Sequence, residues 1–458
     1  MTQSKHESAV IPGGEISAEI GRNLMRVRRV LDEPDVDPIA LLSHLPRHRP
    51  HVFFRPPGGP SYLGFGAAVR LVARPAPGEP WPLPELGERL RAELTAIVGP
   101  ESSWSAFLAC AFDPSSPFGN GKTPWRGYAP IELLAPETLL TVFADRVEVV
   151  HLASPERFVT LEHELETVWN TTAEFGLAGG QRAADLAIEW ADDEHRNNVV
   201  TALGELALPG LDKVVLAHAV AVVGGSPFAP AAILARLAAA NPAAYLFSYR
   251  PRGDSPVFLG ASPERLVTVK AGRVISGALA GSAPRGRTPE EDERLGRELL
   301  SSQKDLEEHA IVGEMITTAL TPLCREVQAE RVPRLERLPT VQHLFTPIEG
   351  TLAAGYQLLD VAHALHPTPA VGGMPRERAL AAIRSLETVP RGLYAGAFGR
   401  LDARGEGDLA VAIRSALVAA DRAWVYAGGG IVPGSDPDLE VEETKLKLAA
   451  VLAALAGG

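Results

Sequence analysis

Residues 1–190 alternate short apolar runs with stretches rich in proline and glycine. The runs at His51–Arg55, 64–71 and 139–150 have the composition and spacing of β-strands, and turn residues bound them. The apolar positions of Leu83–Val98 are instead spaced as in a helix. The hydrophobic pattern therefore predicts a mainly β N-terminal part that contains one helix.

The pattern changes near residue 192, where longer helical segments begin. Helices are predicted at Asp192–Leu206, Pro230–Ala240, 289–319 with a break near Ser301, Arg376–Leu386, and from Leu439 onward. Strands are predicted at Lys213–Val223, 244–249, 257–259, 265–269, 273–275, 393–401, 408–418 and 423–428. Closely spaced strands followed by separate helices indicate an α+β fold with antiparallel sheets and not a regular βαβ series.

Composition and charge narrow the classes of function. The chain has the composition of a globular protein, and its formal net charge of −12 disfavours nucleic acid and anionic membranes as partners. Its apolar runs are all shorter than the roughly 20 residues of a membrane-spanning helix. Cys110 and Cys324 lie far apart without metal-site spacing, which indicates a reducing cytoplasm. Because so acidic a chain repels anions, any site for an anionic substrate should contain a cation.

The predicted closing helix carries three charged residues on one face. Glu440, Glu443 and Lys447 are spaced i, i+3 and i+7, directly after the glycine-rich segment 427–437. Glycine lets the backbone approach a ligand closely, so this face could line a binding site. On spacing alone it could equally be a solvated face with a Glu443–Lys447 ion pair.

A second acidic pair occurs in the segment KDLEEH, where Asp305 and Glu308 share a helix face. Two helices that each present such a pair could together bind one hard divalent cation. Mg²⁺ is suited to this arrangement because it takes one or two carboxylates together with waters and substrate oxygens. Acidic pairs also commonly face water, and the spacing leaves that alternative open.

Three single charged residues stand next to apolar strands. Lys213 begins the run KVVLAHAV, where it could extend to solvent or, with a pKa lowered by burial, act as a base. Glu264 lies on a turn between two strands, where it is either an exposed turn residue or a catalytic acid with a raised pKa. Arg414 is predicted inside an apolar strand, where a buried arginine needs an anion as its partner.

Taken together, these segments resemble the chorismate-utilising enzymes, a family that includes anthranilate synthase large subunits, aminodeoxychorismate synthases, salicylate synthases and isochorismate synthases. The resemblance covers about 195–458, and PSYLGFGAA (60–68) resembles the family more weakly. The segments that carry it are, in order, KVVLA, FLGASPERL, SGALAGSAPRG, SSQKDLEEH, HLFTPIEGTL, HPTPAVGG, GLYAGAFG, AIRSALV and GGGIVPGSDPDLEVEET.

Within the family, the chain looks most like the isochorismate synthases. HPTPAVGG (366–373) resembles their form of this segment, and Lys213 stands where anthranilate synthases usually have glutamine. Aminodeoxychorismate synthases carry a nucleophilic lysine in a PIKGT-like motif. This chain instead has the string PIEGT, with Glu349 at that position. Salicylate synthase is the nearest alternative, followed by an aminating anthranilate or aminodeoxychorismate synthase subunit and by a catalytically silent scaffold protein.

The resemblance implies a role for each site residue. Lys213 would be the base that activates water, and Glu264 the acid that protonates the departing hydroxyl. The metal would be Mg²⁺, and the ligands implied for it are Glu308 and Glu443, with Asp305 and Glu440 nearby. The substrate-binding residues implied are Tyr394, Arg414, Gly428, Lys447 and, with a less defined role, His343.

The resemblance also implies the fold of anthranilate synthase component I: an α+β unit in which two packed antiparallel sheets form a sandwich-like core surrounded by helices. Residues 1–190 would be the N-terminal part of that unit and 191–458 the chorismate-binding catalytic region. The expected protein is a cytoplasmic isomerase that acts on chorismate. It would need no obligatory protein partner. Members of the family are often monomers, and the sequence leaves the oligomeric state open.

Overall fold

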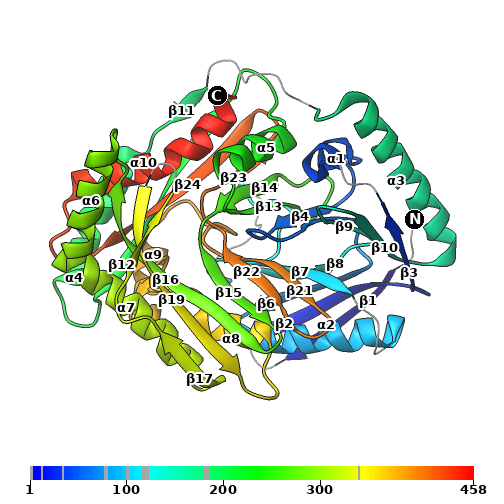
Figure 1. The fold of residues 1–458 in the computed structure, drawn as a ribbon, viewed down its shortest axis with the longest axis horizontal. Helices are drawn as coiled ribbons and strands as arrows, with labels where there is room; N and C mark the ends of the chain where they lie inside the picture. The colour runs from blue at the N-terminus through cyan, green and yellow to red at the C-terminus, as the bar shows by residue number, and fades with distance from the viewer. Residues whose placement is uncertain are drawn as a thin grey trace.

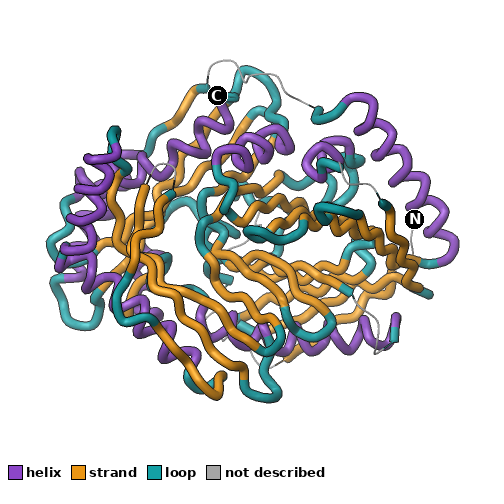
Figure 2. The backbone as a smooth tube through the Cα atoms, in the orientation of Figure 1, coloured by secondary structure: helices purple, strands orange, loops and turns teal. Residues whose placement is uncertain are grey.

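The computed structural model describes residues 4–11, 14–32, 36–76, 81–99, 104–114, 123–178, 186–338 and 341–457. Within these residues the chain forms two antiparallel sheets of twelve strands each, with helices around them. Figure 2 shows the strands in the middle of the molecule and the helices at its periphery. The predicted fold of two packed antiparallel sheets surrounded by helices is confirmed.

The first sheet mixes strands from distant parts of the chain. Its order is β1 (Ser4–Ile11), β2 (Gly14–Gly21), β6 (Val69–Pro75), β8 (Ile131–Ala135), β7 (Ser105–Cys110), β21 (Ala397–Asp402), β22 (Gly407–Val411), β15 (Arg265–Lys270), β16 (Arg273–Pro284), β19 (Val341–Leu352) and β17 (Cys324–Ala329), with β18 (Arg334–Arg337) also paired to β19.

The second sheet contains the strand that begins with Lys213. Its order is β11 (Ala187–Glu189), β12 (Lys213–Val223), β24 (Arg422–Ile431), β23 (Ser415–Ala419), β14 (Val257–Ser262), β13 (Tyr245–Arg250), β4 (His51–Arg55), β5 (Ser61–Phe65), β9 (Thr138–Val142), β10 (Val147–Ala153) and β3 (Met25–Leu31), with β20 (Gly373–Met374) also paired to β12.

Helices lie on both sides of the sandwich (Figure 1). Apolar residues of α1 (Pro38–His44), α3 (Pro155–Phe175), α5 (Pro230–Ala240) and α10 (Pro437–Ala456) share a buried cluster with the second sheet. On the other side α2 (Leu83–Val98) packs against α8 (Leu358–Leu365) and β6. The remaining helices are α4 (Asp192–Leu206), α6 (Pro289–Ser301), α7 (Gln303–Leu320) and α9 (Arg376–Leu386).

Aromatic side chains join the two sheets. The ring of Phe398 on β21 lies 5.3 Å from that of Phe247 on β13 and 6.2 Å from that of Phe54 on β4, between ring centroids. All three side chains are buried, so the contact removes a large apolar area from water. This packing joins the two sheets through a shared aromatic contact.

Most predicted elements are confirmed, several with the same ends. Leu83–Val98, Asp192–Leu206, Lys213–Val223, Pro230–Ala240 and Arg376–Leu386 are observed as predicted. The predicted break near Ser301 is also present, because Ser302 ends α6 and caps α7 by accepting a hydrogen bond from the Asp305 amide. The break lies at a capping residue, which is a local feature of the sequence.

Three predicted strands each span two observed strands. The range 64–71 contains the end of β5 and the start of β6, which belong to different sheets, and Gly66 turns the chain between them with φ +75°. The range 139–150 is a hairpin of β9 and β10. The range 408–418 divides into β22 of the first sheet and β23 of the second. An apolar run does not reveal that the chain changes sheets within it.

Arg414 was therefore predicted in the wrong setting. It lies in the crossover between β22 and β23, where its backbone has φ +53°, and not inside a strand. The helix Pro155–Phe175 was not predicted at all. It buries only Leu161, Leu165 and Val168 among its residues, so its hydrophobic pattern is weak.

Strands from both sides of residue 190 alternate within each sheet. The view of 1–190 as part of the same unit as 191–458 stays a prediction, and this mixture of strands supports it. Among the helices described, none is long and apolar enough to cross a membrane.

Candidate active site

The first wall of the site is the beginning of β12. Lys213 is 1% exposed, and its Nζ donates to Oε1 of Glu308 on α7 at 2.6 Å. The short segment β20 pairs with β12 at Lys213, which places this residue inside the sheet and away from solvent. Its side chain therefore does not extend to water, and the buried alternative of the sequence analysis holds.

Helix α7 forms the second wall and starts at the cap provided by Ser302. The cap turns the first helical turn so that Asp305 and Glu308, three residues apart, lie against the same cavity. Ser302 Oγ also donates to Oδ2 of Asp305. The acidic pair predicted from the spacing thus faces the interior of a site.

Helix α10 provides the third wall, above the glycine-rich end of β24. Lys447 Nζ donates to Glu443 Oε1 at 2.6 Å and to the Gly428 carbonyl at 2.9 Å. Although burial raises the pKa of Glu443, the neighbouring Lys447 lowers it below the usual value. Glu440 is 6% exposed, and burial, helped by the charge of Glu443, raises its pKa to about 7. The Glu443–Lys447 pair exists, and both residues line the cavity.

Glu264 lies on the turn between β14 and β15 and is 7% exposed. Its amide donates to Ser262 Oγ at 3.1 Å, and its carbonyl accepts from the Val411 amide at 3.0 Å, so the turn is fixed on both sides. Burial raises the pKa of Glu264 to about 7, although the charges of Lys213, Lys447 and Arg414 oppose the shift. Near neutral pH this carboxyl group can carry a proton, as a general acid must.

Tyr394 and Arg414 also line the cavity. The rings of Tyr394 and Tyr426 stack at 5.1 Å with an interplanar angle of 16°. Arg414 Nη1 donates to the Lys447 carbonyl at 3.0 Å, which fixes the guanidinium beside α10. Burial lowers the pKa of Arg414 from its ordinary value and raises that of Tyr394. A carboxylate between these two side chains would gain both a cation and a hydroxyl donor.

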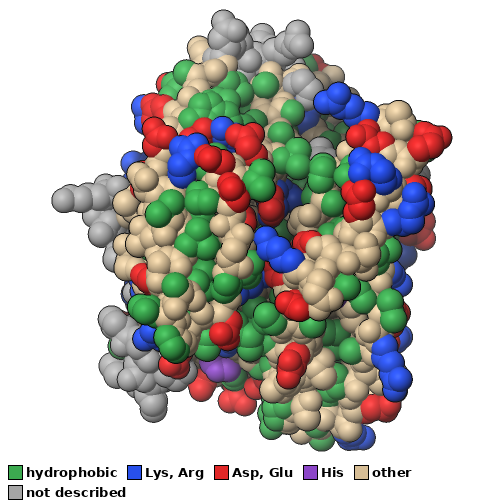
Figure 3. All heavy atoms as spheres, turned by 90° about the vertical axis from the view of Figure 1, so that its left-hand side faces the viewer, with side chains coloured by type: hydrophobic (Ala, Val, Ile, Leu, Met, Phe, Trp, Pro, Cys, Tyr) green, Lys and Arg blue, Asp and Glu red, His purple; other side chains and the backbone are tan. Residues whose placement is uncertain are grey.

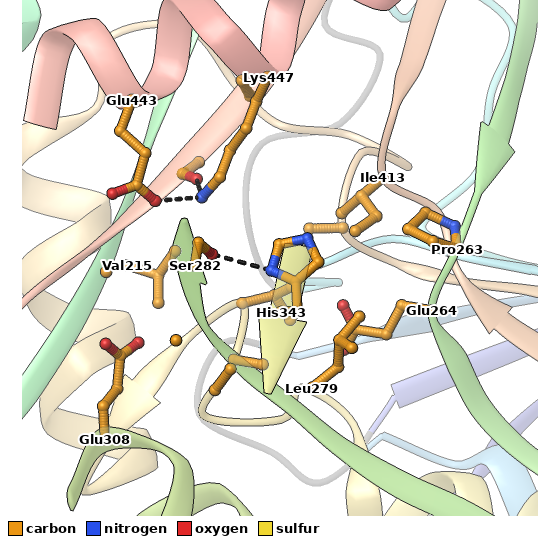
Figure 4. Close-up of a pocket in the computed structure, with 18 of the residues that line it drawn as sticks. Val215, Pro263, Glu264, Leu279, Ser282, Glu308, His343, Ile413, Glu443 and Lys447 are labelled. Carbon is orange, nitrogen blue, oxygen red and sulfur yellow. Dashed lines mark hydrogen bonds and ion pairs between the residues drawn. The ribbon is translucent and has the colours of Figure 1, made fainter. Parts of the chain in front are cut away.

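His343 enters the site from β19. Its Nδ1 and Ser282 Oγ are 2.9 Å apart and share a hydrogen bond (Figure 4). Burial, with help from the charges of Arg414 and Lys447, lowers the pKa of His343 to about 3. The imidazole is therefore neutral at physiological pH, and it can donate or accept a hydrogen bond but adds no charge.

These side chains surround one cavity of about 130 Å³. The face that carries α7 and α10 is hollowed near its centre, with acidic and basic side chains around the hollow (Figure 3). In Figure 4 the carboxylates of Glu308 and Glu443 point toward the same space from opposite sides. The predicted residues that line the cavity are Glu264, Asp305, Glu308, His343, Tyr394, Arg414, Gly428, Glu440, Glu443 and Lys447. Lys213 lies directly behind them, in contact with Glu308.

Glu349, which was noted for its place in the string PIEGT, lies outside the cavity. It is half-exposed on β19, where it pairs with Arg273.

Comparison with known proteins decides the family. The sequence pattern of the family described as "Chorismate binding enzyme" matches residues 20–456. The chain belongs to this family. It is 36% identical to isochorismate synthase MenF of Bacillus subtilis over 359 residues, which are 77% of this chain and 74% of that one.

Solved structures agree with this placement in the family. The menaquinone-specific isochorismate synthase MenF from Escherichia coli superposes with a TM-score of 0.75 at 25% identity, covering 94% of this chain and 95% of that one. Anthranilate synthase component I from Streptococcus pneumoniae gives a TM-score of 0.65 at 24% identity, covering 88% and 92%, and so shares the fold. The chain is thus a chorismate-binding enzyme with the fold predicted from its sequence.

The cavity of this chorismate-binding enzyme also contains residues that the sequence analysis missed. Lys304 lines it beside Asp305, and its charge opposes the rise in the pKa of Glu440. Tyr426 and Ser282 line it as well. Lys304 could have been found, because it stands next to a predicted metal residue, whereas nothing in the apolar alternation of β24 marks Tyr426.

The carboxylates of α7 and α10 are the groups at the cavity that could hold Mg²⁺. Among the described residues, no group of three or more His, Cys, Asp and Glu side chains converges tightly enough to hold an ion without other ligands. Mg²⁺ does not require such a cage, because it uses one or two carboxylates and takes waters and substrate oxygens for the rest. Glu440 Oε2 is buried without a hydrogen-bond partner, and five carboxyl side chains line one cavity, four of them from α7 and α10. Carboxylate oxygens are ligands that Mg²⁺ prefers, so these residues are chemically suited to hold the ion.

Proposed function

We propose that this protein is an isochorismate synthase, which converts chorismate to isochorismate by adding water at C2 with loss of the C4 hydroxyl. The observation that carries the proposal is a buried amine, Lys213, and a buried carboxylic acid, Glu264, at one chorismate-binding cavity. Water is a weak nucleophile and hydroxide a poor leaving group, so the reaction needs a base and an acid. The isochorismate synthases among its relatives support the same activity.

In the proposed reaction Lys213 Nζ takes a proton from the water that attacks C2. Glu264 gives its proton to the C4 hydroxyl, which leaves as water. Both ring double bonds move by one position, from C1=C2 and C5=C6 to C1=C6 and C4=C5. One water is consumed and one released, so the reaction is an isomerisation. Each of the two proton transfers typically contributes roughly 10²–10⁴-fold to the rate.

The two substrate carboxylates would bind at opposite ends of the cavity. Tyr394 and Arg414 would hold the enolpyruvyl carboxylate, and Gly428 would present its backbone beside them. Glu308 and Glu443 would hold Mg²⁺, with Asp305 and Glu440 binding its waters, and the ion would supply positive charge toward the ring carboxylate. Lys447 adds a cation next to Glu443. Cations at both ends thus offset the net charge of −12.

The product would enter menaquinone or siderophore biosynthesis. We also propose a cytoplasmic location, which two free cysteines that form no disulfide support. No nucleic acid or membrane enters the proposed reaction, and neither does an obligatory protein partner.

The test is to incubate the purified chain with chorismate and Mg²⁺ and to separate the products by chromatography. Isochorismate should accumulate without pyruvate or salicylate. Fluorescent salicylate would instead identify a salicylate synthase. Anthranilate or aminodeoxychorismate formed from added ammonia would identify an aminating subunit, and unchanged chorismate would reject catalysis.

Glu308→Gln and Glu443→Gln should each weaken the metal site. Glutamine keeps the shape of glutamate but removes the negative charge that attracts a divalent cation. The Mg²⁺ concentration for half-maximal activity should rise by more than the roughly 10–100-fold typical of changes to a metal's outer partners. Titrating activity with Mg²⁺ measures this.

The matched controls are Glu314→Gln on α7 and Glu442→Gln on α10, which are exposed residues outside the cavity lining. Both should retain the Mg²⁺ requirement of the wild type. An unchanged requirement in Glu308→Gln and Glu443→Gln would reject the metal assignment.

A further inference from the structure

One edge of β12 lacks a continuous neighbouring strand. β24 pairs with the other edge along its length, whereas on this edge β20 pairs only with Lys213 and Val214, and β11 only with Ala221–Val223. The backbone between these two short pairings still has buried amides and carbonyls that need partners. The Val215 amide donates to the Gly372 carbonyl at 2.9 Å, so the gap begins at the Val215 carbonyl, two residues after the proposed base.

Two side chains fill the gap in place of a strand. Arg391 Nη2 donates to the Val215 carbonyl at 2.6 Å, and Glu387 Oε1 accepts from the Ala217 amide at 2.8 Å. The two side chains also pair with each other, with Nη2 of Arg391 2.5 Å from Oε1 of Glu387. They provide the donor and the acceptor that a neighbouring strand would otherwise present.

The same guanidinium holds a second segment of the cavity wall. Arg391 Nη1 donates to the Val371 carbonyl at 2.8 Å, and the Arg391 carbonyl accepts from the Tyr394 amide at 3.0 Å. Val215, Val371 and Tyr394 all line the catalytic cavity, and Figure 4 labels Val215 there. Three parts of the wall, each from a different stretch of chain, therefore meet at one arginine.

Burial makes this arrangement rigid. The side chains of Arg391 and Glu387 are 4% and 9% exposed, and the guanidinium lies 4.0 Å over the ring of Phe112. A planar guanidinium with several fixed donors holds its partners in defined directions, which an ammonium group does not. Neither side chain lines the cavity, so neither would touch the substrate.

We infer that Arg391, held by Glu387, is a positioning residue that sets the place of Lys213 through the backbone of β12 and fixes the cavity wall at Val371. The Val215 carbonyl that its side chain binds is only two residues along the strand from Lys213, so a shift of this carbonyl would also move Lys213. The inference rests on the proposed function, because Lys213 has its role in that reaction.

Arg391→Met should lower kcat on the order of 10²-fold, the size expected when a reacting group is displaced by about 1 Å. KM for chorismate should change much less than kcat, since the substrate carboxylates keep their own partners. Arg391→Lys should recover part of kcat, because one ammonium can satisfy some of the three acceptors. Glu387→Gln should lower kcat to a lesser extent, because the amide oxygen can still accept from Ala217.

The matched control is Arg70→Met. Arg70 is 3% exposed, lies beside Glu132, and donates from Nη2 to the Pro251 carbonyl at 2.6 Å, so it is also a buried arginine that binds backbone. It lies on β6 and does not line the cavity. This variant should lose thermal stability but keep the wild-type kcat per folded molecule.

Steady-state kinetics normalised to the folded fraction, with melting curves for each variant, decide the matter. The inference is overturned if Arg391→Met keeps the kcat of Arg70→Met, or if KM and kcat change equally. Arg391→Met could fail to fold, and then the two milder variants decide. A loss of kcat in Arg391→Lys and Glu387→Gln with normal KM supports the inference, and wild-type kcat in both overturns it.

The failure of the proposed function has a different outcome. Salicylate formed by the wild-type chain would reject the proposed function. The same comparison of variants, with salicylate as the measured product, would still decide the role of Arg391.

Discussion

Replacing Lys213 by methionine should reduce kcat for isochorismate formation by about 10²–10⁴-fold, the range of a lost general base. Methionine fills the buried space at the start of β12 but cannot take a proton from water. KM for chorismate should change little, since Arg414, Tyr394 and Lys447 would still bind the substrate. Stopped assays of isochorismate over a range of chorismate concentrations separate the two parameters.

The change also removes the partner of Glu308, whose Oε1 is 2.6 Å from Lys213 Nζ. Thermal melting should therefore accompany the assay, so that activity is expressed per folded molecule. Lys445→Met is the control, because Lys445 lies on α10 outside the cavity and pairs with Asp192 and Glu442. Wild-type turnover by Lys213→Met would reject Lys213 as the base.

Replacing Glu264 by glutamine should lower kcat by a similar factor of about 10²–10⁴. The amide fits the same turn, but it cannot give a proton to the departing hydroxyl. Glu349→Gln is the matched control, since Glu349 is a half-exposed residue outside the cavity. A folded Glu264→Gln enzyme with normal kcat would show that another group protonates the leaving hydroxyl.

The pH dependence of kcat gives a second test of Glu264. Burial raises the pKa of its carboxyl from 4.5 to about 7. A general acid must be protonated, so its contribution is complete below about pH 7 and falls as the pH rises above that value. The profile of the wild-type enzyme should therefore decline on its alkaline side from about pH 7. This limb should disappear from the residual activity of Glu264→Gln, and its survival there would assign the titration to another group.

The site explains how an acidic protein can bind a doubly negative substrate. Buried or partly buried cations stand at the cavity, and each has a partner: Lys213 pairs with Glu308, Lys447 with Glu443, and Arg414 with a backbone carbonyl. Since burial reduces screening by water and salt, charges in such a place act more strongly than on the surface. The local arrangement therefore outweighs the net charge of the whole chain.

The sequence by itself determined the features that depend on near neighbours. Helical spacing put Glu440, Glu443 and Lys447 on one face, a capping serine marked the break before α7, and ordered motifs revealed the family. These signals are local because helix periodicity and capping involve residues three or four positions apart. The shared helix faces of the two acidic pairs could be predicted for this reason, and the ordered motifs gave the fold class.

Only the tertiary structure decided which distant segments meet. Lys213 and Glu308 are 95 positions apart, and no periodicity in the chain links them. The crossover that carries Arg414 between sheets reads as an uninterrupted strand, and the binding of β12 by Arg391 and Glu387 has no sequence signature. Strand pairing is non-local, so the partner of each strand edge, and with it the geometry of the site, is fixed only when the sheets pack.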